Sequence, residues 1–119
     1  MRRSLSRDVR LYLEDIITCC EKIVRYTQGM TGPEIVADDK TYDAVQRNLF
    51  VLGEAVKSVP DEVRARHPAI AWKKIAGLRD FLGHVYFALD DDILCDLIEN
   101  KVPELLVQIK GVLAAEFPT

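Results

Sequence analysis

The sequence predicts an all-α fold, an up-and-down bundle of four to five helices that forms one domain over residues 1–119. Apolar residues recur at intervals of three and four along most of the chain, which is the spacing of one helix face. No segment alternates between apolar and polar residues as a half-buried strand does. The length of 119 residues and the apolar content of 49% fit one globular domain with its own core.

The first helix is expected over residues 4–28. One apolar stripe marks its buried face: Leu5, Val9, Leu13, Ile16, Cys20 and Ile23. Residues 29–33 contain two glycines and a proline, so they predict the end of this helix and a loop. The second helix is expected to begin at a cap formed by Asp38 or Asp39. Its stripe is Tyr42, Val45, Leu49, Leu52 and Val56.

A short helix is expected next. Ser58 and Asp61 fit a capping box, with Pro60 in the first turn. The helix should end before His67, because the residue that precedes a proline is disfavoured in the α region.

A further helix begins near residues 69–72. Its stripe extends to residue 89: Trp72, Ile75, Leu78, Leu82, Val85 and Leu89. Asp90, Asp91 and Asp92 suit the cap and first turn of the last helix, where negative charge is favourable. That explanation is stronger than a metal site. The last stripe is Leu94, Leu97 or Ile98, Leu105, Ile109, Val112 and Leu113. Pro103 should break or kink this helix because it removes a backbone donor.

The cysteines and the hydropathy indicate a cytoplasmic protein with no membrane segment. Cys19, Cys20 and Cys95 are odd in number and form no C-x-x-C pair, so neither a disulfide framework nor a zinc site is expected. Cys19 and Cys95 are interpreted as core residues. No run approaches the roughly 20 apolar residues of a membrane span. The basic N-terminus is followed by acidic residues, unlike a signal peptide.

The net charge of −3 excludes a broadly basic RNA-coating protein. The charge is unevenly distributed, however. Residues 57–79 carry six basic and two acidic side chains, a net charge of +4, whereas residues 80–119 carry two basic and eight acidic ones. Local fields, not the total charge, attract a phosphate chain. A focused RNA-binding cleft near residues 57–79 therefore remains compatible with the composition, and Lys73 and Lys74 are candidates for it.

The chain has two histidines. His67, between Arg66 and Pro68, is interpreted as a solvated loop residue. His84 lies in an apolar stretch, five residues after Arg79. A histidine can exchange a proton near neutral pH, and an arginine can hold a phosphate and stabilise developing charge, the roles needed to cleave RNA without a metal.

The spacing of these two residues complicates that interpretation. Residues five apart on an ideal helix point about 140° apart, so Arg79 and His84 would face different directions. Either Gly83 loosens the helix, or two chains contribute to one site. Taken alone, His84 is better explained as a buried, hydrogen-bonded helix residue. Arg79 could equally be a surface arginine paired with Asp80.

A longer sequence pattern favours functional roles for Arg79 and His84. Residues 79–86 read R-D-F-L-G-H-V-Y and match R-x4-H-x-Y, the motif of HepT-like proteins in the HEPN superfamily. The flanks also match in order: Arg7-Asp8, Tyr42-Asp43-Ala44-Val45, Gly53-Glu54-Ala55, Pro68-Ala69-Ile70-Ala71-Trp72 and Val102-Pro103-Glu104-Leu105. The sequence therefore resembles this family over nearly its whole length.

The resemblance implies a HEPN-like helical bundle that forms a homodimer, with one composite site at the interface. It implies a metal-independent endoribonuclease that needs no cofactor, with Arg79 and His84 as catalytic residues and Asp80 and Gly83 in support. The enzyme would be the toxin of a two-gene module. An MNT-type nucleotidyltransferase antitoxin would neutralise it by transferring AMP to Tyr86, which puts charge and bulk in the RNA cleft.

Two questions remain open from the sequence. Glu54 is an acidic residue on an otherwise apolar helix face and could pair with a basic group near the cleft. The alternative to an enzyme is a non-catalytic helical partner, or a substrate-binding subunit, of a minimal nucleotidyltransferase. The joint presence of Arg79, His84 and Tyr86 favours the enzyme, because a pure scaffold would not need all three.

Overall fold

The computed structural model of this chain describes the backbone of residues 2–82 and 91–118, and the side chains of residues 8–78 and 91–118. Every element in this part of the chain is a helix, which confirms the predicted all-α class. No helix among these residues is long and apolar enough to cross a membrane.

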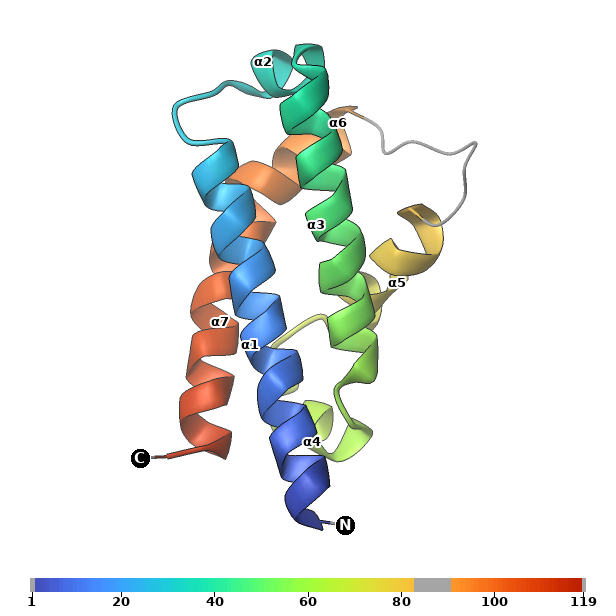
Figure 1. Cartoon of the computed structure of the whole chain (residues 1–119), viewed down its shortest axis with the longest axis vertical. Coiled ribbons are helices and arrows are strands. Elements are labelled where there is room, and N and C mark those ends of the chain that lie inside the picture. Colours follow the sequence, from blue (N-terminus) through green and yellow to red (C-terminus); the bar gives the residue numbers. More distant parts are fainter. Residues whose placement is uncertain (1, 83–90, 119) are drawn as a thin grey trace.

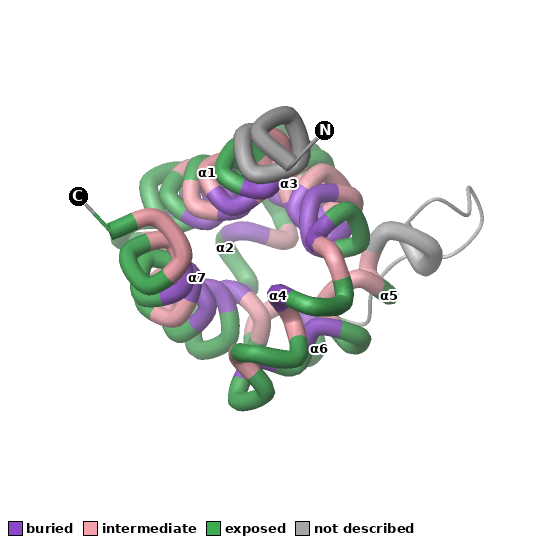
Figure 2. The backbone as a smooth tube through the Cα atoms, turned by 90° about the horizontal axis from the view of Figure 1, so that it is seen from below, coloured by how far each residue is buried: buried purple, intermediate pink, exposed green. Residues whose placement is uncertain are grey.

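Four longer helices run up and down the molecule, and shorter ones join them (Figure 1). α1 (Arg2–Tyr26) packs against both α3 (Asp39–Ser58) and α7 (Val102–Glu116), and α3 packs in turn against α5 (Trp72–Leu82). Figure 2 shows the buried faces of α1, α3 and α7 turned toward a shared interior. The fully buried larger side chains of this core include Leu13, Ile16, Ile23, Val45, Leu49, Leu52, Val56, Leu94 and Ile109.

The α1 stripe is buried as predicted from Val9 to Ile23, while the Leu5 side chain lies outside the described residues. The helix ends at Tyr26, slightly earlier than expected. The buried Thr27 hydroxyl donates a hydrogen bond of 2.8 Å to the Ile23 carbonyl oxygen. Gly29 then takes a φ of 76°, a conformation that favours glycine, and this turns the chain out of the helix.

α2 (Gly32–Ala37) occupies a segment where the sequence predicted only a loop. Thr31 caps it: its hydroxyl accepts from the Glu34 backbone N–H at 3.3 Å, while Glu34 accepts from the Thr31 backbone N–H at 2.8 Å. Pro33 lies in the first turn, where a missing N–H costs nothing. The first helix does end before this segment, as predicted, but Gly32 and Pro33 open α2 instead of continuing the loop, because glycine and proline suit both a loop and a helix start.

The expected capping box between Ser58 and Asp61 is wrong. Ser58 is the last residue of α3, and its hydroxyl donates to the Glu54 carbonyl oxygen at 3.0 Å. α4 (Asp61–Arg66) has Pro60 at its N-cap position and no side-chain cap. Ser58 is still helical, so it cannot be the N-cap of the next helix, and its hydroxyl is used inside α3. Asp38 does occupy the N-cap position of α3, but its carboxylate accepts from the Thr41 hydroxyl at 2.9 Å.

α6 (Asp91–Asp96) opens with the acidic first turn predicted for it. A π-helical turn, η1 (Leu97–Lys101), connects it to α7, and the Val102 N–H bonds to the Leu97 carbonyl oxygen. Pro103 follows directly, in the first turn of α7. The chain changes direction between α6 and α7 (Figure 1), which confirms the predicted kink. The wide turn removes the need for the N–H that proline lacks.

Candidate active site

α5 carries the first half of the motif, and its start is firmly held. Trp72 is 7% exposed, and its indole Nε1 donates to the His67 carbonyl oxygen at 2.9 Å. The Ile70 N–H donates to that same oxygen at 3.3 Å, and the Trp72 N–H donates to the Ile70 carbonyl oxygen at 2.9 Å. Residues 67–72 therefore form a tight turn, closed by buried Ile70 and Trp72, that sets where α5 begins.

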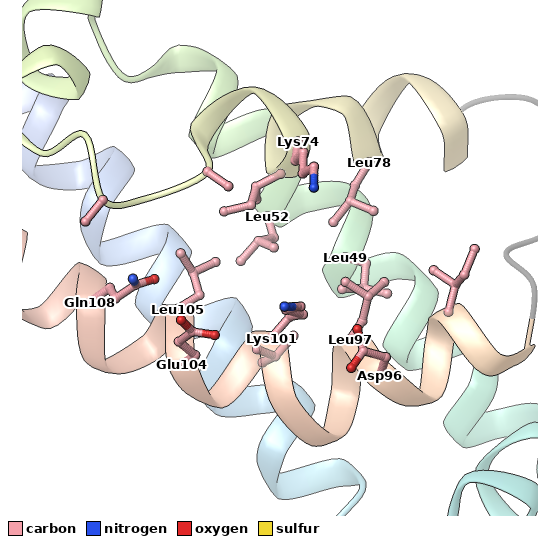
Figure 3. A pocket seen from close by; sticks show the side chains of 15 residues that line it. Leu49, Leu52, Lys74, Leu78, Asp96, Leu97, Lys101, Glu104, Leu105 and Gln108 are labelled. Carbon is pink, nitrogen blue, oxygen red and sulfur yellow. The ribbon is translucent and has the colours of Figure 1, made fainter.

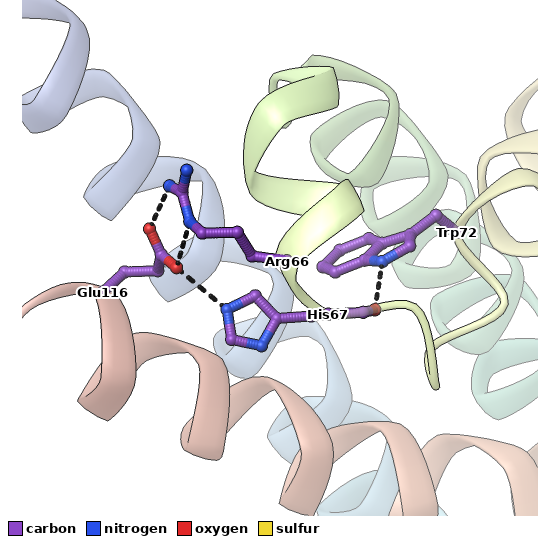
Figure 4. A network of polar contacts seen from close by, with 4 residues as sticks. All are labelled: Arg66, His67, Trp72 and Glu116. Atoms are coloured by element: carbon purple, nitrogen blue, oxygen red, sulfur yellow. Dashed lines mark hydrogen bonds and ion pairs between the residues drawn. The ribbon is translucent and has the colours of Figure 1, made fainter.

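Glu116 ties this turn to the end of α7 (Figure 4). Its carboxylate accepts from both Nε and Nη2 of Arg66, and it lies 2.9 Å from Nε2 of His67. The hydrogen bonds from Arg66, with a smaller contribution from His67, lower the pKa of Glu116 to about 2. The same bonds raise the pKa of Arg66.

The interpretation of His67 as a solvated loop residue is therefore wrong. Its side chain is 21% exposed and faces Glu116. The partner lies 49 residues further along the chain, so no local pattern could have indicated it.

The predicted site residues that the structure describes lie on two neighbouring helices, α3 and α5. Arg79 and Asp80 lie in α5, where the structure describes their backbone but not their side chains. Gly83, His84 and Tyr86 lie outside the described residues altogether, as does the predicted extension of this helix to residue 89.

The remaining candidates can be placed directly. Lys73 and Lys74 are exposed on α5, and Lys74 lines a cavity. Glu54 is half-buried on α3, the helix against which α5 packs, and it does not line that cavity. Both lysines thus lie on the helix that carries Arg79, whereas Glu54 lies on α3 outside the lining of the cavity.

The cavity has a volume of about 400 Å³ and lies between α5 and the η1–α7 segment (Figure 3). Leu49 and Leu52 of α3 form its floor. Aliphatic side chains of α5 and of the facing segment form the walls: Ile75, Leu78, Leu97, Val102 and Leu105. Polar side chains also line it: Lys74, Asp96, Lys101, Glu104 and Gln108. The sequence reasoning missed this cavity, because the walls come from helices far apart in the chain.

The cysteine thiols and the candidate metal ligands were compared over the described residues. Burial raises the pKa of Cys20 to about 12 and also raises the pKa of Cys19, so both stay protonated thiols at neutral pH. Cys19 is buried as predicted, whereas Cys95 is only half-buried, packed beside Gly32. No group of three or more His, Cys, Asp or Glu side chains in the described ranges could hold a metal ion.

Comparison with known proteins identifies the family. A family model described as ribonuclease HepT-like matches residues 16–112. A protein named "Putative RNase MJ0127" from Methanocaldococcus jannaschii is 40% identical over 107 residues, covering 90% of this chain and 88% of that protein. "Putative RNase TTE0752" from Caldanaerobacter subterraneus is 39% identical, covering 90% and 96%. "Probable ribonuclease HepT" from Thermococcus cleftensis is 36% identical, covering 85% and 92%.

This chain belongs to the HepT-like ribonuclease family. The membership confirms the resemblance drawn from the motif and its flanks. No solved structure matches the chain significantly.

Proposed function

We propose that this protein is an endoribonuclease that cleaves RNA without a metal ion, with Arg79 and His84 as its catalytic residues. The observation that carries the proposal is an intact R-x4-H-x-Y motif at residues 79–86 in a chain of the HepT-like ribonuclease family. The relatives' names as ribonucleases support it. The absence of a membrane-spanning helix in the described part, together with three unpaired cysteines, supports a place in the cytoplasm.

The two side chains suit attack by the ribose itself. A base removes the proton of the 2′-hydroxyl, and its oxygen attacks the neighbouring phosphorus. The bond from phosphorus to the 5′-oxygen breaks, an acid protonates that oxygen, and a 2′,3′-cyclic phosphate remains. His84 would supply the proton transfer, and Arg79 would stabilise the charge that builds on the phosphate oxygens.

The site would be composite, at the interface of a homodimer. Arg79 lies near the end of α5, and His84 follows five residues later. On a continuous helix these side chains diverge by about 140°, so one chain alone would not aim both at one phosphate. Two copies related by a two-fold axis would present each residue twice across a shared cleft.

We further propose that the enzyme is the toxin of a two-gene module, with an MNT-type nucleotidyltransferase as its antitoxin. Tyr86, the last residue of the motif, would receive AMP. The added phosphate would repel RNA from the cleft by like charge and occupy its space.

The ribonuclease is tested with purified protein and a structured RNA, with and without a chelator of divalent metals. We expect cleavage in both conditions, ending in a 2′,3′-cyclic phosphate. Arg79→Ala and His84→Ala should each lower the rate by roughly 10²–10⁴-fold, the usual loss on removing a catalytic acid, base or charge stabiliser. Folding of the variants is checked by circular dichroism and thermal unfolding.

The alternative, a non-catalytic partner of a nucleotidyltransferase, predicts a different outcome. It requires that Arg79→Ala and His84→Ala behave as the native protein does in the RNA assay. It also requires that expression of each variant arrests growth as strongly as expression of the native protein does. Equal residual cleavage in the native protein and both variants would exclude the proposed catalytic pair.

The modification is tested by co-expression with a neighbouring nucleotidyltransferase and mass spectrometry of the intact protein. We expect an adduct of AMP mass that is absent from Tyr86→Phe. An adduct that persists in Tyr86→Phe would place the modification on another residue.

A further inference from the structure

The cavity between α5 and the η1–α7 segment has the form of a small-ligand site. Its volume of about 400 Å³ lies within the range of ligand pockets, and its lining is mainly aliphatic with a few polar groups. A helix, about 10–12 Å across with its side chains, would need a longer and wider groove. The occupant that fits is therefore a compact molecule with an apolar body and charged or polar edges.

The charges around the cavity fit a nucleotide. Figure 3 shows Lys74 on the α5 wall and Lys101 on the facing wall, with Glu104 and Asp96 beside Lys101. Within the described part of the chain, the ion pairs closer than 4 Å involve neither lysine. Two ammonium groups on opposite walls can bind the phosphates on the 5′ and 3′ sides of one ribose while the base contacts the half-buried aliphatic walls.

The carboxylates indicate which bases fit. One oxygen of Asp96 already accepts from the Asn100 amide at 2.8 Å, so Glu104 is the more available acceptor. A carboxylate accepts hydrogen bonds from the exocyclic amino group of cytosine, adenine or guanine, whereas uracil lacks that group and offers only its ring N3–H. Gln108 adds an amide that can both donate and accept.

The position of the cavity links it to the motif. Leu78 lines it and directly precedes Arg79 on α5. Lys74 and Arg79 are five residues apart on α5, which is about 7.5 Å along the helix axis and about 140° around it. An RNA chain with one nucleotide in the cavity would therefore reach Arg79 through a different phosphate.

We propose that this cavity binds one nucleotide of the substrate RNA, with the base against the half-buried Ile75 and Leu97, its phosphates on Lys74 and Lys101, and its amino edge on Glu104. This inference rests on the proposed ribonuclease function and extends it to substrate recognition. It predicts a preference for bases that carry an amino group.

The test measures binding of CMP and UMP to the purified protein by calorimetric titration. CMP should bind more tightly than UMP. Lys101→Glu should weaken both by roughly tenfold, because a charge-assisted contact to phosphate becomes a repulsion. Glu104→Ala should remove the preference for CMP over UMP. Gln108→Trp, which fills the cavity, should abolish binding of both.

Lys40→Glu is the matched control. Lys40 is exposed at the start of α3, outside the cavity, and its reversal makes the same change in total charge. If Lys40→Glu and Lys101→Glu weaken nucleotide binding equally, the effect of Lys101→Glu arises from the net charge of the protein, and the proposed site is wrong. A change of oligomeric state in Gln108→Trp would instead assign the cavity to a protein partner and likewise overturn it.

The two proposals fail in different ways. If native protein cleaves RNA but neither mononucleotide binds, the cavity is not a nucleotide site and the ribonuclease stands. If CMP binds in the predicted manner but no RNA is cleaved, the proposed function fails. Arg79→Ala should lose cleavage while keeping CMP binding, which separates the two sites within one protein.

Discussion

Glu116 links the C-terminal helix to the segment that leads into the motif helix. It is 13% exposed and accepts hydrogen bonds from Arg66 and His67 at the end of α4. The His67 carbonyl oxygen in turn accepts from Trp72 at the start of α5. The position of α5, and of Arg79 on it, therefore depends on contacts made by a residue near the end of the chain.

Glu116→Gln should make the protein less stable at neutral pH and flatten its stability in acid. The native pKa of Glu116 is about 2, below its ordinary value of 4.5, so the carboxylate stabilises the folded state above pH 4.5. That contribution is lost as the pH falls from 4.5 to about 2. We expect a loss of about 1 kcal/mol at pH 7, kept small because the Arg66 side chain is 53% exposed.

Urea unfolding at pH 7, 4.5 and 3 measures this effect. The difference between native protein and Glu116→Gln should shrink at the lowest pH. Glu99→Gln, an exposed carboxylate on η1, is the control and should change little at any pH. A constant difference across the three pH values would assign the loss to packing instead of to charge.

At the level of elements, α2 docks on α6 through a close approach at Gly32. A Cβ atom built on Gly32 would overlap Sγ of Cys95. Gly32→Ala should therefore lower the free energy of unfolding by about 1–3 kcal/mol, the usual cost of overpacking. Thermal and urea unfolding of the purified variant provide the measurement.

A double variant shows whether the close approach is the cause. Cys95→Ala removes the sulfur, so Gly32→Ala in that background should cost much less. Gly111→Ala serves as a matched control, because nothing lies within 4 Å of a Cβ built there. Equal losses in both backgrounds would mean that the cost of Gly32→Ala arises elsewhere, for example in the first turn of α2.

The α6–α7 junction shows how one residue shapes a longer element. The sequence placed a break or kink at Pro103, and the structure contains a π-helical turn immediately before it. The turn redirects the helix and places Lys101, Glu104 and Leu105 along one wall of the cavity. The local chemistry of proline thus contributes to a site that also involves α3 and α5.

For the whole molecule, the proposed composite site of a homodimer predicts complementation between inactive variants. When Arg79→Ala and His84→Ala proteins are mixed and allowed to exchange, each heterodimer carries one intact Arg79 and one intact His84 on different copies. Cleavage by the mixture should rise well above the sum of the two separate proteins. The measurement is the RNA cleavage rate after co-refolding, with sedimentation to confirm dimers.

The converse result has a clear meaning. A stable dimer that shows no complementation would place Arg79 and His84 of each site on the same chain. A monomer that cleaves RNA would remove the need for a second copy. Either result would contradict the composite site but would leave the catalytic roles of Arg79 and His84 possible.

Much of the fold could be predicted from the sequence, and the errors have two causes. The stripes of α1 and α3 identified Leu13, Ile16, Leu49 and Leu52 as buried, because helix periodicity is a local property. The errors fell where one pattern fits two structures, as at the start of α2 and at the capping box assigned to Ser58. The assignment of His67 failed because its partner is remote in the chain.

The candidate site divides in the same way. By itself the sequence determined the helical class, the core-facing stripes, the motif at residues 79–86 and, through that motif, the family. Only the tertiary structure decided that Glu116 meets Arg66 and His67, that α2 docks on α6, and that α5 and the η1–α7 segment enclose a cavity. The physical reason is range: periodicity, caps and motifs act over a few residues, whereas contacts between distant segments depend on how whole helices pack.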